Sequence, residues 1–309
     1  MPDVLLFPGH AGHTREHLEH ELAVTQTAGI ARRIDRVATA EFGLAACFDI
    51  RGDLVRLAHD GPEHADMAAF AVSLARYRAI RRHPPRPAVL LGHSFGHLTA
   101  LTCAGAFSVE DAARLLCYRN KAVAALPPRR TGMACLGLCA ARTRRLLADA
   151  DADSDAAEKS AIACYNSPAQ TVVAGPVTAL ARLRRLALDN QLLYLRLPAS
   201  FAFHTRLARP AVATMRALAA GIRQRRLGGA VFSATLRRFC TDDDDLVAQM
   251  ARDLARPVYF RHAVGRLHAA GAAGFVECGP GALLARLVAE TLPGATLDPR
   301  ARTACLTPS

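Results

Sequence analysis

The stretch Leu91-Gly92-His93-Ser94-Phe95-Gly96 decides how the rest of the chain can be interpreted. A short apolar run at 87–91 precedes it, and helix-favouring sequence at 98–106 follows it. Gly-x-Ser-x-Gly between a buried strand and a helix is the pattern of a nucleophile elbow, a turn so tight that glycine must flank it. We therefore predict that Ser94 is a nucleophile rather than a solvated serine in an ordinary glycine turn. The N–H of Phe95 and the helix N-terminus would then face an oxyanion formed beside the hydroxyl.

The overall composition is that of a folded protein with a large core. The chain has 309 residues, of which 51% are hydrophobic and 21% charged, so broad disorder is not expected. No apolar run approaches the ~20 residues that span a bilayer. The N-terminus lacks the basic and apolar segments of a signal peptide. We therefore expect a soluble, cytoplasmic protein that does not interact with membranes.

The charge is strongly basic, and arginine carries nearly all of it. A net charge of +12 favours an acidic partner or a phosphate-bearing substrate. Nucleic acid is the competing interpretation, but tryptophan is absent, other aromatic residues are few, and the arginines are spread over helix faces, so we expect no nucleic-acid binding. The nine cysteines form no Cys-x-x-Cys pair, and the histidines lack ligand spacing. We therefore expect neither a disulfide framework nor a metal site.

Strand and helix patterns alternate on both sides of a central segment of different texture. Strands are expected at 3–8, 87–91, 230–234 and 274–278, and helices at 16–40, 67–82, 109–125, 242–254, 257–269 and 282–290. Between 132 and 198 the order strand, helix, strand, strand, helix, strand fits a ferredoxin-like βαββαβ unit. The expected fold class is α/β, with a large subdomain of residues 1–130 and 199–309 and an inserted small subdomain of residues 131–198.

A serine nucleophile needs a base within hydrogen-bond reach. The best candidate is His204, because the apolar run before it ends at the junction with the small subdomain. His93 adjoins Ser94, but we expect the elbow to turn its side chain into the protein interior. His97 lies on the helix after the elbow, where an exposed or capping role and a catalytic role both remain open.

Five motifs occur in a fixed order along essentially the whole chain. They are Phe7-Pro8-Gly9, Gly92-His93-Ser94-Phe95-Gly96, NSPAQTVVAG at 166–175, Phe201-Ala202-Phe203-His204 and ECGPGALL at 277–284. Together they closely resemble the malonyl-CoA:acyl-carrier-protein transacylase family, which includes the acyltransferase domains and stand-alone acyltransferases of polyketide synthases. The resemblance implies an α/β-hydrolase-like core with a ferredoxin-like insertion, and a catalytic dyad of Ser94 and His204.

The resemblance also implies how an acyl group would be held. Arg119 matches the family arginine that grips the free carboxylate of a malonyl group, and a planar guanidinium can hold a carboxylate bidentately. The alternative is an ordinary arginine on a helix surface. Family members that accept malonyl units often show His-Ala-Phe-His at the base, and this chain has Phe201 at the first of those positions. The resemblance thus implies that Phe201 and Phe203, with Arg119, bind the substrate. A bulky Phe203 would fill the space that an α-methyl group needs, a discrimination of about 1–3 kcal/mol.

Several positions depart from the family pattern. The Gly-Gln-Gly-Ser-Gln loop of the family is here Gly9-His10-Ala11-Gly12-His13, a usual glutamine is Asp66, and an acidic residue is His97. The residue that helps to orient the base matches Asp253, whose carboxylate could complete a Ser-His-Asp arrangement. An oxyanion hole formed by the backbone N–H groups of His10 and Phe95 would survive these side-chain changes.

The expected function is transfer of a malonyl or related acyl group from CoA to the phosphopantetheine thiol of an acidic acyl carrier protein, in polyketide or fatty-acid biosynthesis. The reaction would pass through an acyl-serine and need no bound cofactor. One alternative, motivated by His10, His13 and Asp66, is a carrier-protein thioester hydrolase or a carrier-to-carrier transacylase for a different acyl group. A non-catalytic carrier-docking module is the other alternative, against which the retained Ser94 and His204 argue.

Overall fold

The computed structural model describes residues 2–9, 15–59, 62–81, 88–126, 130–152, 154–155, 159–272 and 274–294. Within this part of the chain, a five-stranded sheet with the order β10-β9-β4-β1-β11 forms the centre of the molecule. The strands β1 (Asp3–Phe7), β4 (Ala88–Gly92), β9 (Ala230–Ser233) and β11 (Gly274–Glu277) run parallel, and β10 (Arg238–Phe239) is an antiparallel edge. In the β1–β4 register, Phe7 pairs with Gly92. The ends of the two central strands therefore meet directly below the elbow.

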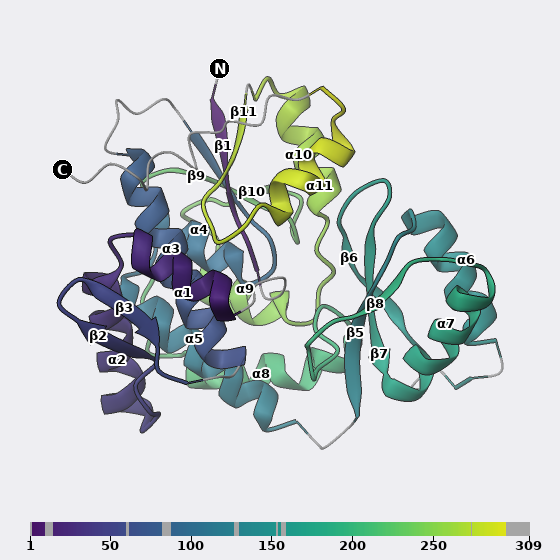
Figure 1. Cartoon of the computed structure of the whole chain (residues 1–309), viewed down its shortest axis with the longest axis horizontal. Helices are drawn as coiled ribbons and strands as arrows, with labels where there is room; N and C mark the ends of the chain where they lie inside the picture. Colours follow the sequence, from purple (N-terminus) through teal and green to yellow (C-terminus); the bar gives the residue numbers. More distant parts are fainter. Residues whose placement is uncertain are drawn as a thin grey trace.

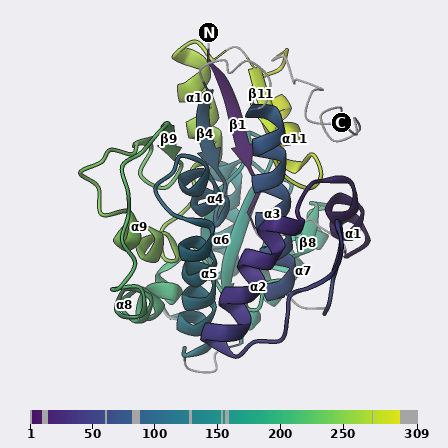
Figure 2. The same cartoon turned by 90° about the vertical axis from the view of Figure 1, so that its left-hand side faces the viewer.

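Helices cover both faces of this sheet, as Figures 1 and 2 show. Side chains alternate along β1, so Leu5 and Phe7 join one hydrophobic cluster while Val4 and Leu6 join another. A strand buried on both faces is an unbroken apolar run, which is the pattern of β1. The first face carries α1 (Arg15–Val24), α2 (Ala28–Phe42), α3 (Pro62–Arg81), α4 (Gly96–Cys103), α5 (Val109–Ala124), α8 (Arg209–Leu218) and α9 (Leu246–Asp253); the second carries α10 (Phe260–Ala269) and α11 (Leu283–Thr291).

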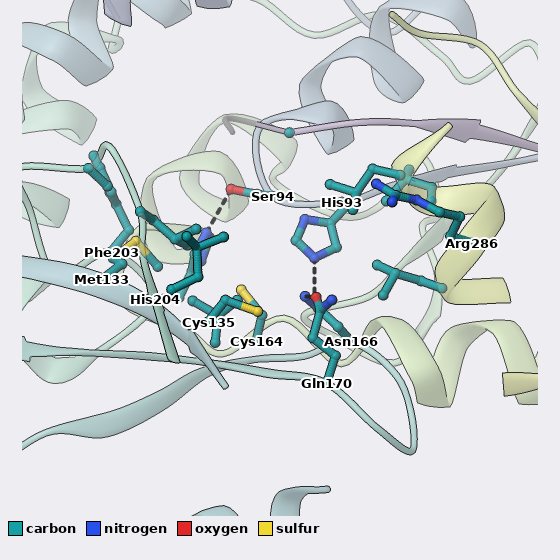
Figure 3. Close-up of a pocket in the computed structure, with 18 of the residues that line it drawn as sticks. His93, Ser94, Met133, Cys135, Cys164, Asn166, Gln170, Phe203, His204 and Arg286 are labelled. Atoms are coloured by element: carbon teal, nitrogen blue, oxygen red, sulfur yellow. Dashed lines mark hydrogen bonds between the residues drawn. The ribbon is translucent and has the colours of Figure 1, made fainter. Parts of the chain in front are cut away.

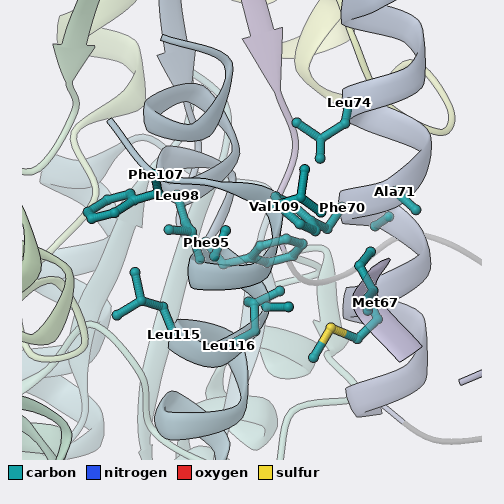
Figure 4. Packing of buried hydrophobic residues seen from close by; sticks show 14 of the residues in the cluster. Met67, Phe70, Ala71, Leu74, Phe95, Leu98, Phe107, Val109, Leu115 and Leu116 are labelled. Carbon is teal, nitrogen blue, oxygen red and sulfur yellow. The ribbon is translucent and has the colours of Figure 1, made fainter. Parts of the chain in front are cut away.

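The elbow is held from below by a dense apolar layer. Apolar residues recur along α3 at positions 67, 70, 71 and 74, the spacing of one helical face. Figure 4 shows this face beside Phe95 of the elbow and Leu115 and Leu116 of α5. All of these side chains except Ala71 are large, and each is at most 7% exposed. Tight packing of this kind fixes the position of α4, and therefore of the turn before it.

The second sheet has the order β6-β7-β5-β8 and is antiparallel throughout. Its elements are β5 (Thr131–Leu136), α6 (Ala140–Ala150), β6 (Ala161–Tyr165), β7 (Thr171–Pro176), α7 (Val177–Asp189) and β8 (Tyr194–Arg196), a βαββαβ order. One face packs on α6 and α7 in a hydrophobic cluster of its own. From the opposite face, Met133, Cys135, Cys164 and Val172 join the cluster of α10 and α11. The side chains on this opposite face, together with Ser94 and residues of α11, line a cleft between the two sheets.

The structure differs from the expected elements at several points. The helix expected at 16–40 is two helices, because the hydroxyls of Thr25 and Thr27 bond to the carbonyls of Glu21 and Leu22 and compete with the helix between them. A hairpin of β2 (Phe48–Arg51) and β3 (Leu54–Leu57) was not expected. The last strand of the second sheet, which the sequence predicts at 192–197, covers only 194–196. None of the described helices has the length and apolar character to cross a membrane.

Candidate active site

The elbow depends on two glycines that stand against other backbone. A Cβ atom at Gly96 would collide with the carbonyl oxygens of Phe7 and Pro8, and one at Gly92 would collide with the main chain of Gly96 and His97. Ser94 itself has φ 55°, a left-handed conformation that costs a non-glycine residue free energy and is typical of functional turns. The tight strand-turn-helix predicted from the sequence is therefore present, with α4 beginning two residues after the serine.

Ser94 meets a base that comes from far along the chain. Its Oγ lies 2.7 Å from Nε2 of His204, a residue 110 positions later, and Figure 3 shows this hydrogen bond. On the other side of the ring, Nδ1 lies 2.8 Å from the carbonyl oxygen of Asp253 and 3.0 Å from that of Arg256. Carbonyl oxygens only accept, so Nδ1 carries the proton and Nε2 is left to accept the serine proton.

His204 is electrostatically suited to act as a base. Burial, with a smaller contribution from the neighbouring His93, lowers its pKa to about 4. The imidazole is therefore neutral at pH 7 and able to take a proton. His204 also has φ 61°, and its N–H donates to the carbonyl of Leu254 at 2.6 Å. The backbone thus aims the ring at Ser94 at the cost of a strained conformation.

The prediction that the carboxylate of Asp253 orients the base is wrong, because a different atom of Asp253 binds the imidazole. The carbonyl oxygen of Asp253 binds the imidazole, whereas its carboxylate accepts a hydrogen bond from Thr235 at 2.6 Å. The carboxyl group is buried, and burial raises its pKa to about 7. Among the described residues, its Oδ2 has no hydrogen-bond partner. The backbone at the end of α9, and not the side chain of Asp253, therefore holds the imidazole ring of His204.

Asp253→Asn is therefore expected to leave labelling of Ser94 by a serine-reactive phosphonate within about threefold of the unaltered rate. Asparagine keeps the carbonyl that holds His204 and an oxygen that can accept from Thr235. A carboxylate that orients a catalytic histidine loses about 10⁴-fold when it becomes an amide. The labelling rate, measured by intact mass spectrometry at several probe concentrations, separates the two cases. A loss of about 10³-fold or more would restore the carboxylate to the orienting role.

Arg119 lies inside the site and not on a helix surface. It is 9% exposed and lines two cavities together with Ser94 and His204. Its guanidinium carbon lies 4.8 Å from the ring centre of Phe203 and 6.0 Å from that of Phe95, positions in which a cation is attracted to the ring faces. The structure therefore brings together Ser94, His204, Arg119 and Phe203, as the sequence predicted.

A buried acidic partner of Arg119 was not predicted. Nη1 of Arg119 donates to a carboxylate oxygen of Asp66 at 2.8 Å. Asp66 comes from the second turn of α3 and Arg119 from the C-terminal half of α5, 53 positions apart. The sequence marked Asp66 as unusual, but spacing alone gave no sign that the two charges meet.

Two cavities open from Ser94. The larger has a volume of about 370 Å³ and runs between the two sheets, with mainly apolar walls from β5–β8 and α11. The smaller, about 40 Å³, lies beyond Phe203 among side chains of α4, α5, α8 and α9. Phe203 lines both cavities, but Phe201 lines neither in the described structure. It lines a neighbouring, mainly apolar cavity of about 180 Å³, so of these two phenylalanines Phe203 is the one beside Ser94.

The remaining predicted residues have other outcomes. His93 lies in the interior against Phe260, with its Nε2 2.9 Å from Oδ1 of Asn166, and it also lines the larger cavity. His97 is buried beside Gln249, with Nε2 of His97 3.1 Å from Nε2 of the glutamine, so it is not exposed, and it lines neither cavity at Ser94. Phe95 lies directly before the first residue of α4, as an oxyanion-hole donor would. His10, the other expected donor, lies outside the described residues.

Some wall residues had no assigned role in the sequence. Asn166 and Gln170 bond to each other at 2.7 Å and face the larger cavity from the turn between β6 and β7, and Arg286 faces it from α11. The first two lie in a motif noted for resemblance only. Over the described residues, no group of three or more His, Cys, Asp or Glu side chains is arranged to hold a metal ion.

Comparisons with known proteins agree on one family. A family model described as "Acyl transferase domain" matches residues 28–305. Mycoketide-CoA synthase of Mycobacterium tuberculosis is 34% identical over 233 residues, which are 75% of this chain and 5% of that protein. The spectinabilin polyketide synthase system protein NorC of Streptomyces orinoci is 31% identical over 293 residues, 94% of this chain and 12% of that protein. The chain therefore spans a small part of these relatives.

Solved structures share the fold over nearly the whole chain. The acyltransferase domain of an iterative polyketide synthase in enediyne biosynthesis has a TM-score of 0.69 and 29% identity, with 98% of this chain and 68% of that chain covered. The malonyl CoA-acyl carrier protein transacylase of Coxiella burnetii has a TM-score of 0.80 and 23% identity, with 99% and 96% covered. A type II polyketide synthase acyl-carrier protein in complex with its malonyl-transacylase has a TM-score of 0.82 and 21% identity, with 99% and 99% covered.

Proposed function

This chain belongs to the acyl transferase domain family and is an acyltransferase, and from that premise we propose that it moves a malonyl or related acyl group from CoA to the phosphopantetheine thiol of an acyl carrier protein. The hydrogen bond between Ser94 and His204 at the elbow carries the proposal. A serine held in this way, beside a neutral imidazole of fixed tautomer, is arranged for acyl-enzyme chemistry. The cytoplasmic setting expected from the sequence is part of the same proposal.

The first half-reaction acylates the serine. His204 takes the proton of Ser94 as Oγ attacks the thioester carbonyl, and a tetrahedral oxyanion forms. In this proposal the N–H of Phe95, directly before α4, donates to that oxyanion. The second donor that the sequence predicts, the N–H of His10, lies outside the described residues. When the intermediate collapses, the C–S bond breaks and the CoA thiolate takes the proton from His204. The product is an acyl-serine with His204 neutral again.

The second half-reaction reverses these roles with a different thiol. His204 takes the proton of the carrier's phosphopantetheine thiol, the thiolate attacks the acyl-serine, and Oγ of Ser94 leaves with the proton from His204. The basic net charge of +12 favours an acidic carrier. The larger cavity, with its mainly apolar walls, provides a path along which a slender thiol arm can reach Ser94.

Two side chains bear on the acyl group. Arg119 lines the cavities at Ser94 and carries the charge that a malonyl carboxylate would need. Phe203 fills the space beside the base and lies against the guanidinium, where it would exclude an α-methyl branch at a cost of about 1–3 kcal/mol.

Ser94→Ala is expected to abolish covalent acyl loading. In the test, the protein is mixed with a panel of acyl-CoA donors that includes malonyl-CoA, and adducts are read by intact mass and peptide mapping. We expect an adduct on Ser94 in the unaltered protein and none in the variant, because Ser94 is the only hydroxyl among the described residues that pairs with His204. A panel in which no donor forms an adduct would reject the CoA-dependent reaction, and an adduct only with other donors would reject malonyl.

A second candidate is a carrier-protein thioester hydrolase or a carrier-to-carrier transacylase for a different acyl group. The observation that favours it is the pairing of Arg119 with Asp66, which occupies the cation that a malonyl carboxylate would need. Turnover of an acyl-CoA with and without an acceptor carrier distinguishes the candidates. Release of free acid at equal rates in both conditions would favour hydrolysis, and acceptor-dependent turnover would favour transfer.

A further inference from the structure

The proposed mechanism gives no role to the acidic side chain that pairs with Arg119 beside the smaller cavity at Ser94. Arg119 is the cation that lines the cavity of about 40 Å³ at Ser94. Its Nη1 donates to Asp66 at 2.8 Å, and the two side chains are only 11% and 7% exposed. A guanidinium and a carboxylate in such contact sum to zero charge, and water can screen them little. An acyl group that enters here meets a neutral pair and not a bare cation.

A second acidic group lies at the same cavity and further reduces its positive charge. Asp253 lines the same cavity, and its carboxyl group is buried with Oδ2 unpaired among the described residues. His204, on the same wall, is neutral because burial lowers its pKa. The charged and titratable groups that line the cavity or bind its arginine are therefore Arg119, Asp66, Asp253 and His204. Their total charge is not positive.

The rest of the cavity wall is apolar. It is formed by Phe95, Leu98, Leu115, Leu116, Phe203, Met215, Met250 and Leu254. A buried water needs roughly 10–15 Å³ on the same measure of volume, so a cavity of about 40 Å³ has room for three or four non-hydrogen atoms. A short hydrocarbon tail satisfies such a wall without any charge partner. A carboxylate tail must share Arg119 with Asp66, and two carboxylates on one buried cation repel each other.

We propose that Asp66 is a specificity-determining residue that competes with the substrate carboxylate for Arg119, and thereby extends the acyl range from malonyl to short uncharged acyl groups such as acetyl and propionyl. The inference rests on the proposed acyl-serine function and names the substrate class of that site. Asp66 acts through Arg119 and is a positioning residue, since it does not line the cavities at Ser94.

The first test compares acyl-CoA donors on Asp66→Asn. Asparagine keeps an oxygen that can accept from Arg119 and removes the competing charge. We expect the ratio of Ser94 loading rates for malonyl-CoA over propionyl-CoA to rise about 10- to 100-fold, the order expected when a like charge leaves a buried site. The matched control is Asp49→Asn, in which an acidic side chain 46% exposed and paired with Arg51 is changed, and there the ratio should stay constant. An unchanged ratio in Asp66→Asn would overturn the proposal.

The second test uses the unaltered protein, so it remains decisive if Asp66→Asn does not fold. Two serine-reactive phosphonates of equal length, one with a propyl tail and one with a terminal carboxylate, are compared by their rates of labelling Ser94. We expect the carboxylate probe to be favoured by no more than about tenfold, because the guanidinium is already paired. A preference of a hundredfold or more for the carboxylate would overturn the proposal.

The two tests separate this inference from the proposed function. Phosphonates need neither CoA nor a carrier. If no acyl-CoA loads Ser94 while the probes label with the expected small preference, the CoA-dependent function fails and the role of Asp66 is supported. If acyl-CoA donors load Ser94 but both ratios strongly favour the carboxylate in the unaltered protein, the function holds and the role of Asp66 is rejected.

Discussion

Replacing His204 with asparagine is expected to slow phosphonate labelling and acyl loading of Ser94 by about 10³-fold or more, at the upper end of what a general base contributes. Without the imidazole, nothing accepts the serine proton at the 2.7 Å contact. Asparagine is a better test than alanine, because residue 204 has φ 61° and asparagine tolerates the left-handed region better than alanine does. The measurement is the second-order labelling rate of Ser94 at pH 7, with far-UV circular dichroism as the check on folding.

The matched control for this prediction is His268→Asn. His268 is an exposed histidine in the last turn of α10, away from the cavities at Ser94, so its replacement should leave the labelling rate unchanged. If His204→Asn kept more than about a tenth of the unaltered rate while folded, His204 would not be the base. The neighbouring His93 lines the same cavity and would become the residue to test.

The predictions from sequence succeeded where chemistry depends on local backbone geometry. The elbow could be predicted because only glycine fits where two main-chain segments approach closely, as Gly92 and Gly96 do. His204 could be predicted because a serine nucleophile needs a partner, and few histidines follow an apolar run at a junction of this kind. Both inferences used a physical requirement that a single short segment satisfies.

The predictions failed where function depends on which atom of a residue is used. Asp253 was chosen for its carboxylate, yet its carbonyl oxygen binds the imidazole. Every residue has that carbonyl, so the sequence carries no signal for it. The contact with His204 depends on the position at which α9 ends, because that position places the carbonyl beside the ring. Phe201 shows the same limit, because its neighbour Phe203 faces Ser94 while Phe201 lines another cavity.

Long-range pairs between charges were also beyond the sequence. Asp66 and Arg119 lie on separate helices that pack through apolar side chains, and their contact follows from the relative rotation of those helices. The unpredicted β2–β3 hairpin has a similar cause: its strands are four residues each, too short for periodicity to identify. Its turn contains Gly52 with φ 63°, a conformation typical of hairpin turns.

Gly96→Ala is expected to destabilise the protein by at least about 3 kcal/mol, at the severe end for a single methyl group. The added Cβ would overlap the carbonyl oxygens of Phe7 and Pro8 at the end of β1. Phe7 is the last residue of β1, a central strand that pairs with β4 and β11, and its carbonyl oxygen accepts from the N–H of His93 at 2.9 Å. Pro8 follows it directly, so these oxygens cannot move away without disturbing the end of the sheet. The helix must move instead, which would carry Ser94 out of reach of His204. We expect the melting temperature to fall by at least about 6 °C and Ser94 labelling to fall with it.

Gly265→Ala provides the matched control, since it makes the same chemical change within another helix. Nothing lies within 4 Å of a Cβ atom built at Gly265 in α10, and alanine is the better helix former, so this variant should be more stable by about 0.5–1 kcal/mol. Opposite signs from one methyl group at two helical glycines would show that close approach, and not helix propensity, requires glycine at 96. Equal stabilisation in both variants would mean that α4 can retreat from β1 freely. The elbow would then not be the rigid support from which the placement of Ser94 against His204 follows.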